Sequence, residues 1–264
     1  MLLHFALQQT GGRVKKQNAI SASRGVVEDL VAASRILARE GVLDAYGHVS
    51  ARSDREPGRF VMSRSLAPAL VVAADVMELD VATSEPRAGE ARKAFLERFI
   101  HGEIYRSRPD VKAIVHSHSP SVIPFGVTKA KLRPVYHMAG FLWSGAPVYD
   151  IRNTRPENDL LIRDRSLGAA LTQTLGSCAC VLMRGHGMTV VGESVPEAVF
   201  RAIYTEMNAK LQLLAEQLQG PIDFLSDAEG KGATAVNRAT LDRPWELWKS
   251  EVAGKSGAKA RKRS

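Results

Sequence analysis

The sequence predicts an α/β fold, a single three-layer α/β/α domain built around a central mixed sheet. Amphipathic segments with helical spacing alternate irregularly with short runs rich in β-branched residues. Some of these runs are joined by turns too short to contain a crossover helix, which favours a mixed sheet over a parallel, doubly wound one. With 264 residues, 45% of them hydrophobic and 24% charged, the chain can bury one sizeable core.

Helical periodicity is the first support for this fold. Apolar residues recur at the spacing of one helix face in four segments: 23–40, 90–108, 161–176 and 195–218. Gly41 follows the first segment and Pro109 follows the second, and both are common helix stop signals. The prolines of SPSVIPFGV (119–127) predict a further short helix and turn.

Short β-rich runs supply the sheet. GHVSARS (47–53) and RFVMS (59–63), separated by the turn-rich DREPG, predict a hairpin. VKAIVHSH (111–118) predicts a strand because it is rich in β-branched residues. SCACVLMR (177–184) and GHGMTVVG (185–192) predict two more strands that turn at the Gly-His-Gly sequence.

The chain divides into four expected regions. These are an N-terminal arm at 1–22, the domain at 23–220, an irregular C-terminal extension at 221–252, and a basic, disordered tail at 253–264. The arm has an apolar start with no charged segment before it, which indicates a loose arm rather than a signal peptide. We expect the extension to pack on the domain or on a neighbouring subunit.

Most of the positive charge lies in the tail. The net charge is +8, and five of these charges belong to the tail residues Lys255, Lys259, Arg261, Lys262 and Arg263. A tail of this composition is typical of a solvated, disordered end. No zinc-finger spacing, aromatic RNA-binding motif or helix-turn-helix pattern accompanies it, so nucleic acid is not an expected partner.

The apolar residues and the cysteines bear on location. The chain has no continuous apolar run of about 18 residues, so we expect no membrane partner. Cys178 and Cys180 are two residues apart, which is neither a C-x-x-C motif nor a favourable disulfide spacing. They predict two small buried residues on a strand of a cytoplasmic protein.

Histidines carry the chemistry of this sequence. His116 and His118 alternate on one predicted strand, so they share a face, and their spacing suits two ligands of one ion. A hydrogen-bonded pair of core or surface histidines is the alternative. His186 lies between two glycines at a predicted turn, where the backbone can approach a ligand closely. Glu97 and His101 share a helix face, and either side chain could reach the ion. The pattern predicts one divalent metal ion that acts as a Lewis acid on a small, anionic, oxygen-rich substrate.

The motif E-x3-H-x3-Y-x2-RPDV-x-AIVHSH, followed about seventy residues later by GHG, resembles the class II aldolase/adducin family. The resemblance covers residues 24–220 and implies an α/β/α domain with a largely antiparallel sheet. It implies a homotetramer with the site near a subunit interface. It also implies that the metal ligands are Glu97, His116, His118 and His186, with Glu97 alternating between ligand and general base. Either Mn²⁺ or Zn²⁺ fits this ligand set, and ligand type leaves Fe²⁺ and Co²⁺ open.

The chain departs from the sugar-phosphate aldolases where they bind phosphate. Those places read Gly47-His48, Ser65-Leu66 and Phe95-Leu96, so several donors that a phosphate needs are missing. We therefore expect no phosphosugar substrate. His48, Arg64 and Ser65 are expected to bind a substrate carboxylate, and Arg184, which precedes the Gly-His-Gly turn, suits the same group. Phe95 and Leu96 suit a flat ring. Ordinary ion pairing and core packing are the alternatives for these residues.

A further departure concerns a tyrosine of the aldolases, a proton donor that reaches in from the neighbouring subunit. His137 stands in its place and is expected to act as the catalytic acid, unless Tyr136 has taken the role. With GHVSAR, MSRSLAPAL and VYHMAGF, the chain resembles the branch that contains 3-hydroxy-2-methylpyridine-4,5-dicarboxylate 4-decarboxylase.

This branch implies a metal-dependent carbon–carbon lyase that decarboxylates a hydroxylated aromatic or pyridine (di)carboxylate. Three alternatives stay open. The first is an aldolase or epimerase acting on a non-phosphorylated sugar or sugar acid, and the second is a non-haem iron oxygenase of the same family. The third is an adducin-like interaction module without catalysis.

Overall fold

The computed structural model describes residues 20–253, and its centre is a seven-stranded sheet. The expected arm at 1–22, apart from its last three residues, and the expected tail, apart from residue 253, lie outside the described residues. The strand order is β3-β2-β1-β4-β7-β6-β5. The strands are β1 (His48–Arg52), β2 (Arg59–Ser63), β3 (Val76–Asp80), β4 (Ala113–Ser117), β5 (Val148–Tyr149), β6 (Cys180–Met183) and β7 (Gly187–Gly192). Only β5 and β6 pair in parallel, so the expected mixed, largely antiparallel sheet is confirmed.

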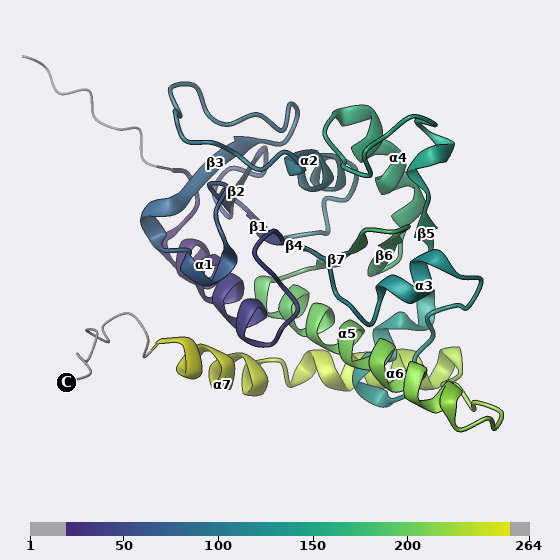
Figure 1. Ribbon diagram of the computed structural model, residues 1–264. Helices are drawn as coiled ribbons and strands as arrows, with labels where there is room; N and C mark the ends of the chain where they lie inside the picture. Colours follow the sequence, from purple (N-terminus) through teal and green to yellow (C-terminus); the bar gives the residue numbers. More distant parts are fainter. Residues whose placement is uncertain (1–19, 254–264) are drawn as a thin grey trace, which may run out of the picture.

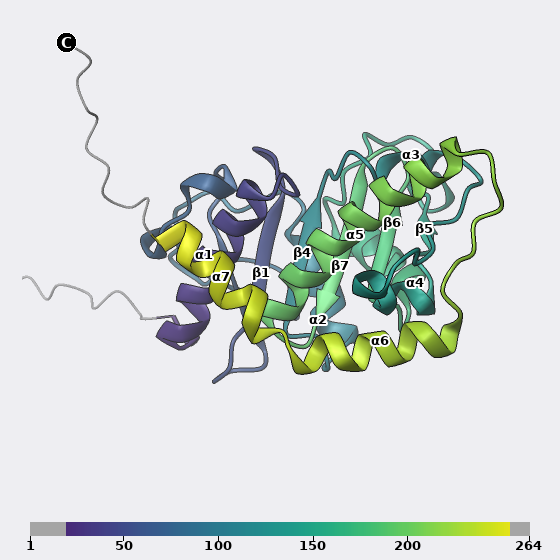
Figure 2. The ribbon, with the colours of Figure 1, turned by 90° about the horizontal axis from the view of Figure 1, so that it is seen from below.

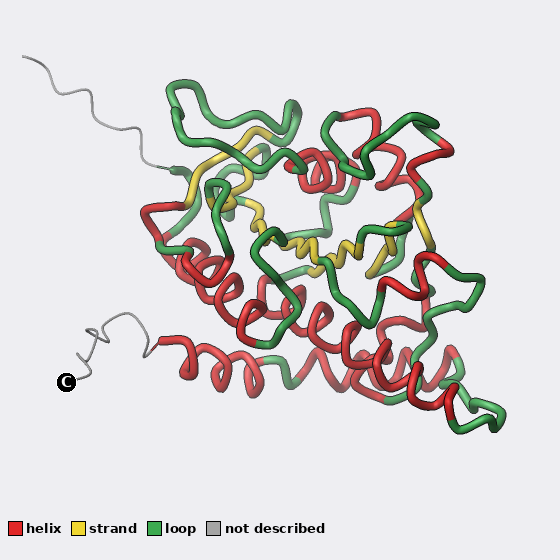
Figure 3. The backbone as a smooth tube through the Cα atoms, viewed as in Figure 1, coloured by secondary structure: helices red, strands yellow, loops and turns green. Residues whose placement is uncertain are grey.

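Helices cover both faces of the sheet and make the three layers (Figure 1; Figure 3). The helices are α1 (Arg24–Arg39), α2 (Arg98–Ser107), α3 (Ile123–Val127), α4 (Arg165–Leu175), α5 (Val195–Gln217), α6 (Asp227–Ala239) and α7 (Asp242–Ala253). The short 3₁₀ segments are η1 (Pro68–Leu70), η2 (Ala73–Asp75), η3 (His137–Ser144) and η4 (Ile151–Asn153). No described helix is long and apolar enough to cross a membrane.

Successive residues of β4 serve two separate cores, because side chains alternate across a sheet. Val115 packs in the core under α1 and α5, whereas Ile114 packs in the core under α2 and α4. His116 has the same parity as Ile114, so it lies on the α2 side of the sheet. This alternation explains why a buried histidine can continue an apolar strand without entering the larger core.

The second helix begins later than its periodicity predicts. A helix over residues 90–108 was expected, but α2 starts at Arg98 and residues 90–97 form a loop. Hydrogen bonds to the region before and at β3 hold this loop: the Arg92 guanidinium donates to the carbonyls of Ala74 and Val76, and Ser65 N–H donates to the carbonyl of Lys93. Glu97 is therefore the residue that precedes the helix rather than part of a helix face.

Residues 221–252 were expected to be irregular, and this expectation was wrong. They contain α6 and α7, which lie against the rest of the domain (Figure 2). Helix α6 begins with a capping box between Ser226 and Glu229. It then approaches η3 through glycines, since a Cβ on Gly230 would lie 2.5 Å from the Cβ of Trp143 and 2.9 Å from the carbonyl of Gly140. Such a face lacks the large apolar residues that hydrophobic periodicity detects.

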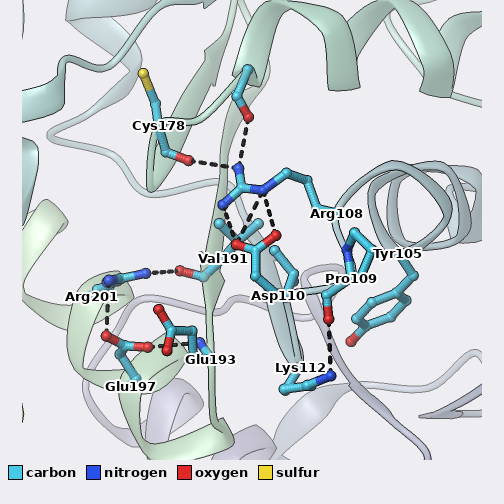
Figure 4. A network of polar contacts seen from close by, with 12 residues as sticks. Tyr105, Arg108, Pro109, Asp110, Lys112, Cys178, Val191, Glu193, Glu197 and Arg201 are labelled. Atoms are coloured by element: carbon cyan, nitrogen blue, oxygen red, sulfur yellow. Dashed lines mark hydrogen bonds and ion pairs between the residues drawn. The ribbon is translucent and has the colours of Figure 1, made fainter. Parts of the chain in front are cut away.

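The RPDV motif holds the start of β4 (Figure 4). Arg108 forms an ion pair with Asp110 at 2.6 Å and donates to the carbonyls of Gly176 and Cys178. These contacts tie the end of α2 to the turn between α4 and β6. Cys180 is buried on β6 and Cys178 is half-buried just before it, and both are free thiols.

Candidate metal centre and adjoining cavity

His116 presents a buried nitrogen without a partner. Its ring is fully buried at the end of β4, and Nδ1 lies 3.1 Å from the carbonyl oxygen of Met188. Because a carbonyl only accepts, Nδ1 carries the proton and Nε2 has a free lone pair. Nε2 has no hydrogen-bond partner among the described residues. Burial lowers the pKa of His116 to about 3, so the ring is neutral and suited to bind a metal.

His186 is placed by the two glycines that flank it. Gly185 has a φ of +64°, a conformation that glycine adopts without strain. A Cβ on Gly187 would lie only 2.0 Å from the carbonyl oxygen of Ser117, so only glycine allows β7 to begin this close to β4. Nδ1 of His186 donates to the carbonyl of Leu160 at 2.9 Å, which again leaves Nε2 free.

His118 completes the set of imidazoles from the residue just after β4. Its Nδ1 donates to the carboxylate of Asp44 at 3.1 Å, and its Nε2 lies 3.2 Å from Nε2 of His186. Both Nδ1 atoms are committed as donors, so in their neutral forms the two rings direct lone pairs at each other across this distance. A cation bound by both nitrogens removes this repulsion, and such outer hydrogen bonds are typical of histidines that bind metals.

Glu97 adds one carboxylate oxygen. Its Oε1 accepts a hydrogen bond from the backbone N–H of Ile162 at 2.9 Å, and its Oε2 lies 3.5 Å from Nε2 of both His116 and His186. Burial raises the pKa of Glu97, but its contacts with the imidazoles of His186 and His116 and the hydrogen bond from the Ile162 amide outweigh burial and lower the pKa to about 2. Burial likewise lowers the pKa of His186, yet Glu97 reverses this and raises it. The carboxylate therefore favours positive charge at this point.

The four ligand atoms lie within 4.8 Å of one another. Nitrogen and oxygen ligands about 2.1 Å from a central ion are separated by about 3.0 to 4.2 Å in common coordination geometries. Three imidazoles and one carboxylate thus fit one divalent cation. The geometry brings together all four residues that the sequence proposes as ligands: Glu97, His116, His118 and His186.

A cavity of about 470 Å³ adjoins the cluster. Its lining includes Glu97 and His118 together with four further residues that the sequence singled out, His48, Ser65, Phe95 and Leu96. Apolar surface comes from Leu66, Ala67, Leu96, Leu161, Ala45 and Tyr46. The cavity thus connects apolar walls with the candidate metal ligands.

Lys93 also lines this cavity, and sequence reasoning missed it. Its ammonium group forms no ion pair or hydrogen bond with another described residue. The sequence contained a usable signal, since Lys93 lies two residues before Phe95 in a segment already compared with the phosphate-binding region of the aldolases. The helical spacing of residues 90–108 puts residues 93 and 95 on different helix faces, whereas in the loop that the structure shows both line the cavity.

The structure does not bring the other expected residues to the cavity within one chain. Arg64 forms an ion pair with Asp75 at 2.7 Å, and Arg184 pairs with Asp150 at 3.0 Å. Neither arginine is among the residues that line the cavity. His137 is exposed at the start of η3 and also lies outside the lining. A role for His137 requires a second copy of the chain.

His101 was the alternative to Glu97, and it points elsewhere. Its ring is fully buried and bonds to His48 and Ser50 at 2.7 and 2.6 Å. Burial lowers the pKa of His101 to about 3, and it lowers the pKa of His48 well below its usual value. Both rings are therefore neutral.

A three-layer α/β/α domain with three histidines at one end of two central strands, and a glutamate that precedes a covering helix beside them, is typical of the class II aldolase type. The family model described as the class II aldolase and adducin N-terminal domain matches residues 28–213, and the chain belongs to this family.

Relatives of this chain include two decarboxylases. Decarboxylase tropJ of Talaromyces stipitatus is 40% identical over 248 residues, which cover 86% of this chain and 93% of that protein. The 3,4-dihydroxyphthalate decarboxylase of Arthrobacter keyseri is 30% identical over 219 residues, which cover 78% of this chain and 84% of that protein. Among solved structures, L-fuculose 1-phosphate aldolase from Glaciozyma antarctica PI12 matches with a TM-score of 0.70 at 22% identity, covering 86% of this chain and 88% of that one. The last likeness shows the shared fold alone.

Proposed function

We propose that this protein is a divalent-metal-dependent decarboxylase of a hydroxylated aromatic or pyridine dicarboxylate. One observation carries the proposal: beside the metal-binding cluster, the cavity combines flat apolar walls with a free cation and neutral donors. The relatives named as decarboxylases support the reaction, and the printed substrate of one of them, 3,4-dihydroxyphthalate, supports the substrate class.

Apolar residues would bind the substrate ring, and charged and polar residues would bind its carboxylate. Phe95 and Leu161 offer apolar surface to an aromatic ring, and Lys93 offers a charge-assisted hydrogen bond to a carboxylate. Ser65 and His48 can donate to the same group. Arg64 was expected to bind this carboxylate, but its guanidinium forms an ion pair with Asp75. Lys93 is therefore the better source of positive charge.

The metal ion would be held by Glu97, His116, His118 and His186, and when bound it supplies Lewis acidity that stabilises negative charge on a substrate oxygen. The apolar walls exclude water from the ring. Glu97 is ionised and its Oε2 is free of backbone hydrogen bonds, so it can accept a proton from a substrate hydroxyl.

The reaction itself needs one proton. The bond between the ring and the carboxylate breaks, its electron pair stays on the ring carbon, and carbon dioxide leaves. That carbon then takes a proton, either from Glu97 or from His137 contributed by a neighbouring copy. We retain the homotetramer, the cytoplasmic location and the roles of Ser65 and His137 as predictions.

The test is carbon dioxide release from 3,4-dihydroxyphthalate by the full chain, combined with elemental analysis of the purified protein. Carbon dioxide and a dihydroxybenzoate are the expected products, with Mn²⁺ or Zn²⁺ bound. Release of a two- or three-carbon carbonyl fragment from a sugar acid, without carbon dioxide release, would indicate an aldolase instead. Strict dependence of turnover on oxygen would indicate an oxygenase.

A further inference from the structure

Four hydrogen-bonded side chains lead from the interior of the domain to the cavity. Tyr105 OH lies 2.8 Å from Oγ of Ser50, which lies 2.6 Å from Nδ1 of His101. Nε2 of His101 lies 2.7 Å from Nδ1 of His48. Each of the four residues is at most 3% exposed, and His48 is the one that lines the cavity.

The hydrogen bonds that link these four side chains have a preferred direction of donation. Among the described residues, the Tyr105 hydroxyl has no hydrogen-bond partner other than Ser50. If Ser50 donated to Tyr105, the phenol proton would be left without an acceptor in a buried position. One unsatisfied buried donor disfavours that arrangement by about 5- to 150-fold. Tyr105 therefore donates to Ser50, and Ser50 donates to Nδ1 of His101.

The direction of donation along these hydrogen bonds determines which ring nitrogen carries the proton in His101 and in His48. A neutral ring carries one proton, so His101, which accepts at Nδ1, must carry its proton on Nε2. That proton is donated to Nδ1 of His48, and His48 must then carry its own proton on Nε2. Nε2 of His48 has no hydrogen bond to another described residue, and its N–H is available to a molecule in the cavity.

We propose that the Tyr105–Ser50–His101 chain fixes His48 as the Nε2–H tautomer, which makes His48 a hydrogen-bond donor to a carboxylate oxygen of the substrate. Ser50 and His101 are the positioning residues in this scheme, and Tyr105 supports the direction by donating to Ser50. The inference rests on the proposed function only for the identity of the acceptor. The tautomer itself follows from the hydrogen bonds that link Tyr105, Ser50, His101 and His48.

The surroundings of His48 fit this role. Its ring packs against the rings of Phe95 and His116 at centroid distances of 4.5 and 5.0 Å, so it lies between the apolar wall and a metal-binding residue. Ser65 and Lys93 line the same cavity and add further donors. As an Nε2–H tautomer, His48 cannot accept a proton from the substrate unless every hydrogen bond of the chain reverses.

Nitrogen-15 NMR of histidine-labelled full-length protein, loaded with diamagnetic Zn²⁺, tests the tautomer directly. His48 is assigned by the loss of its signals in His48→Gln, and His101 by their loss in His101→Gln. The proposal expects the protonated nitrogen of both rings to be Nε2. Protonation of Nδ1 in either ring of the wild type would overturn it.

Two variants separate the positioning chain from general packing. Ser50→Ala removes the link that sets the direction, so both tautomers of His48 should be populated. Tyr105→Phe should keep the Nε2–H tautomer, because the Ser50 proton still needs His101 as its acceptor. Ser34→Ala removes another buried hydroxyl, one that donates to the carbonyl of Leu30 in α1, and serves as the matched control. An unchanged His48 tautomer in Ser50→Ala would contradict the proposal.

Phthalate, which has two adjacent ring carboxylates, probes the acceptor. Its addition should shift the Nε2–H proton resonance of His48, and Ser50→Ala should bind phthalate about twofold more weakly because about half of its molecules hold the competent tautomer. Phthalate binding without a shift of His48 would overturn the donor role. A correct tautomer and shift with no carbon dioxide release from 3,4-dihydroxyphthalate would refute the proposed function and leave this inference intact.

Discussion

Asp44 gives the sharpest test of the metal centre. Its Oδ1 accepts from the backbone N–H of Tyr46 and Gly47 at 2.8 and 3.1 Å, and its Oδ2 accepts from Nδ1 of His118 at 3.1 Å. Asp44→Asn can keep the two turn hydrogen bonds while it replaces the acceptor for His118 with an amide N–H₂. The amide and the imidazole would then be two opposed donors, and the tautomer with a free Nε2 would lose its support.

The size of the effect follows from the exposure of this pair. Loss of an outer hydrogen bond of this kind typically weakens metal binding by about 10- to 100-fold. The Asp44 side chain is 50% exposed, so solvent screens the interaction, and the lower end of that range applies. We therefore expect Asp44→Asn to weaken Zn²⁺ binding by about 10-fold, which corresponds to about 1.4 kcal/mol.

The assay is a competition titration with a chromogenic chelator under metal-free conditions. Asp80→Asn is the matched control, since Asp80 also uses one oxygen for a turn, at 3.0 Å from Thr83 N, and the other for Arg59 at 3.1 Å. The control should bind Zn²⁺ like the wild type. Equal affinities of Asp44→Asn and wild type, or equal weakening by both variants, would refute the reasoning.

Four further expectations concern the same centre and its support. His116→Ala should abolish both bound metal, by elemental analysis, and carbon dioxide release, and retention of either contradicts the ligand assignment. Lys93→Met should raise KM about 10-fold with little change in kcat, whereas Lys93→Arg should retain most of the affinity; an unchanged KM in Lys93→Met would remove Lys93 from substrate binding. Gly187→Ala should lower the free energy of unfolding by about 3 kcal/mol or more, because its Cβ would lie 2.0 Å from the Ser117 carbonyl, and an unchanged Tm would be inconsistent with that contact. Burial lowers the pKa of His101 from 6.5 to about 3, so the unfolded chain takes up a proton below pH 6.5 that the folded chain refuses, and stability is lost as pH falls through that window. In urea unfolding between pH 6.5 and pH 4, His101→Gln should reduce the slope of stability against pH by about 1.4 kcal/mol per pH unit, and an unchanged slope speaks against a neutral His101.

The sequence could predict those parts of the site that local geometry determines. Alternation along a strand places Ile114 and His116 on one face and Val115 on the other, and the structure shows this arrangement. Flanking glycines mark a close approach of two backbones, and Gly187 makes such an approach to Ser117. The helices at 23–40 and 195–218 agree with α1 and α5 to within a residue or two, because their apolar periodicity is strong.

Long-range contacts determine what the sequence could not predict. Residues 90–97 have helical spacing, but hydrogen bonds from Arg92 to carbonyls distant in sequence hold them as a loop. Helix α6 packs through Gly230, so it lacks the apolar stripe by which helices are found. Arg64 and Lys93 are both cations near the expected pocket, and only the position of Asp75 decides which of them is paired.

The anchors of the proposed metal ligands suggest how this family can change its substrates. Glu97 is held by the amide of residue 162, and His116 and His186 are held by the carbonyls of residues 188 and 160. A substitution at any of these three anchoring positions changes a side chain but leaves the anchoring group in place. The side chains of cavity residues such as Phe95 and Lys93 do not anchor any of these ligands. Evolution can therefore vary the cavity while the metal chemistry is inherited unchanged, and Asp44 is the one anchor among these that a point mutation can remove.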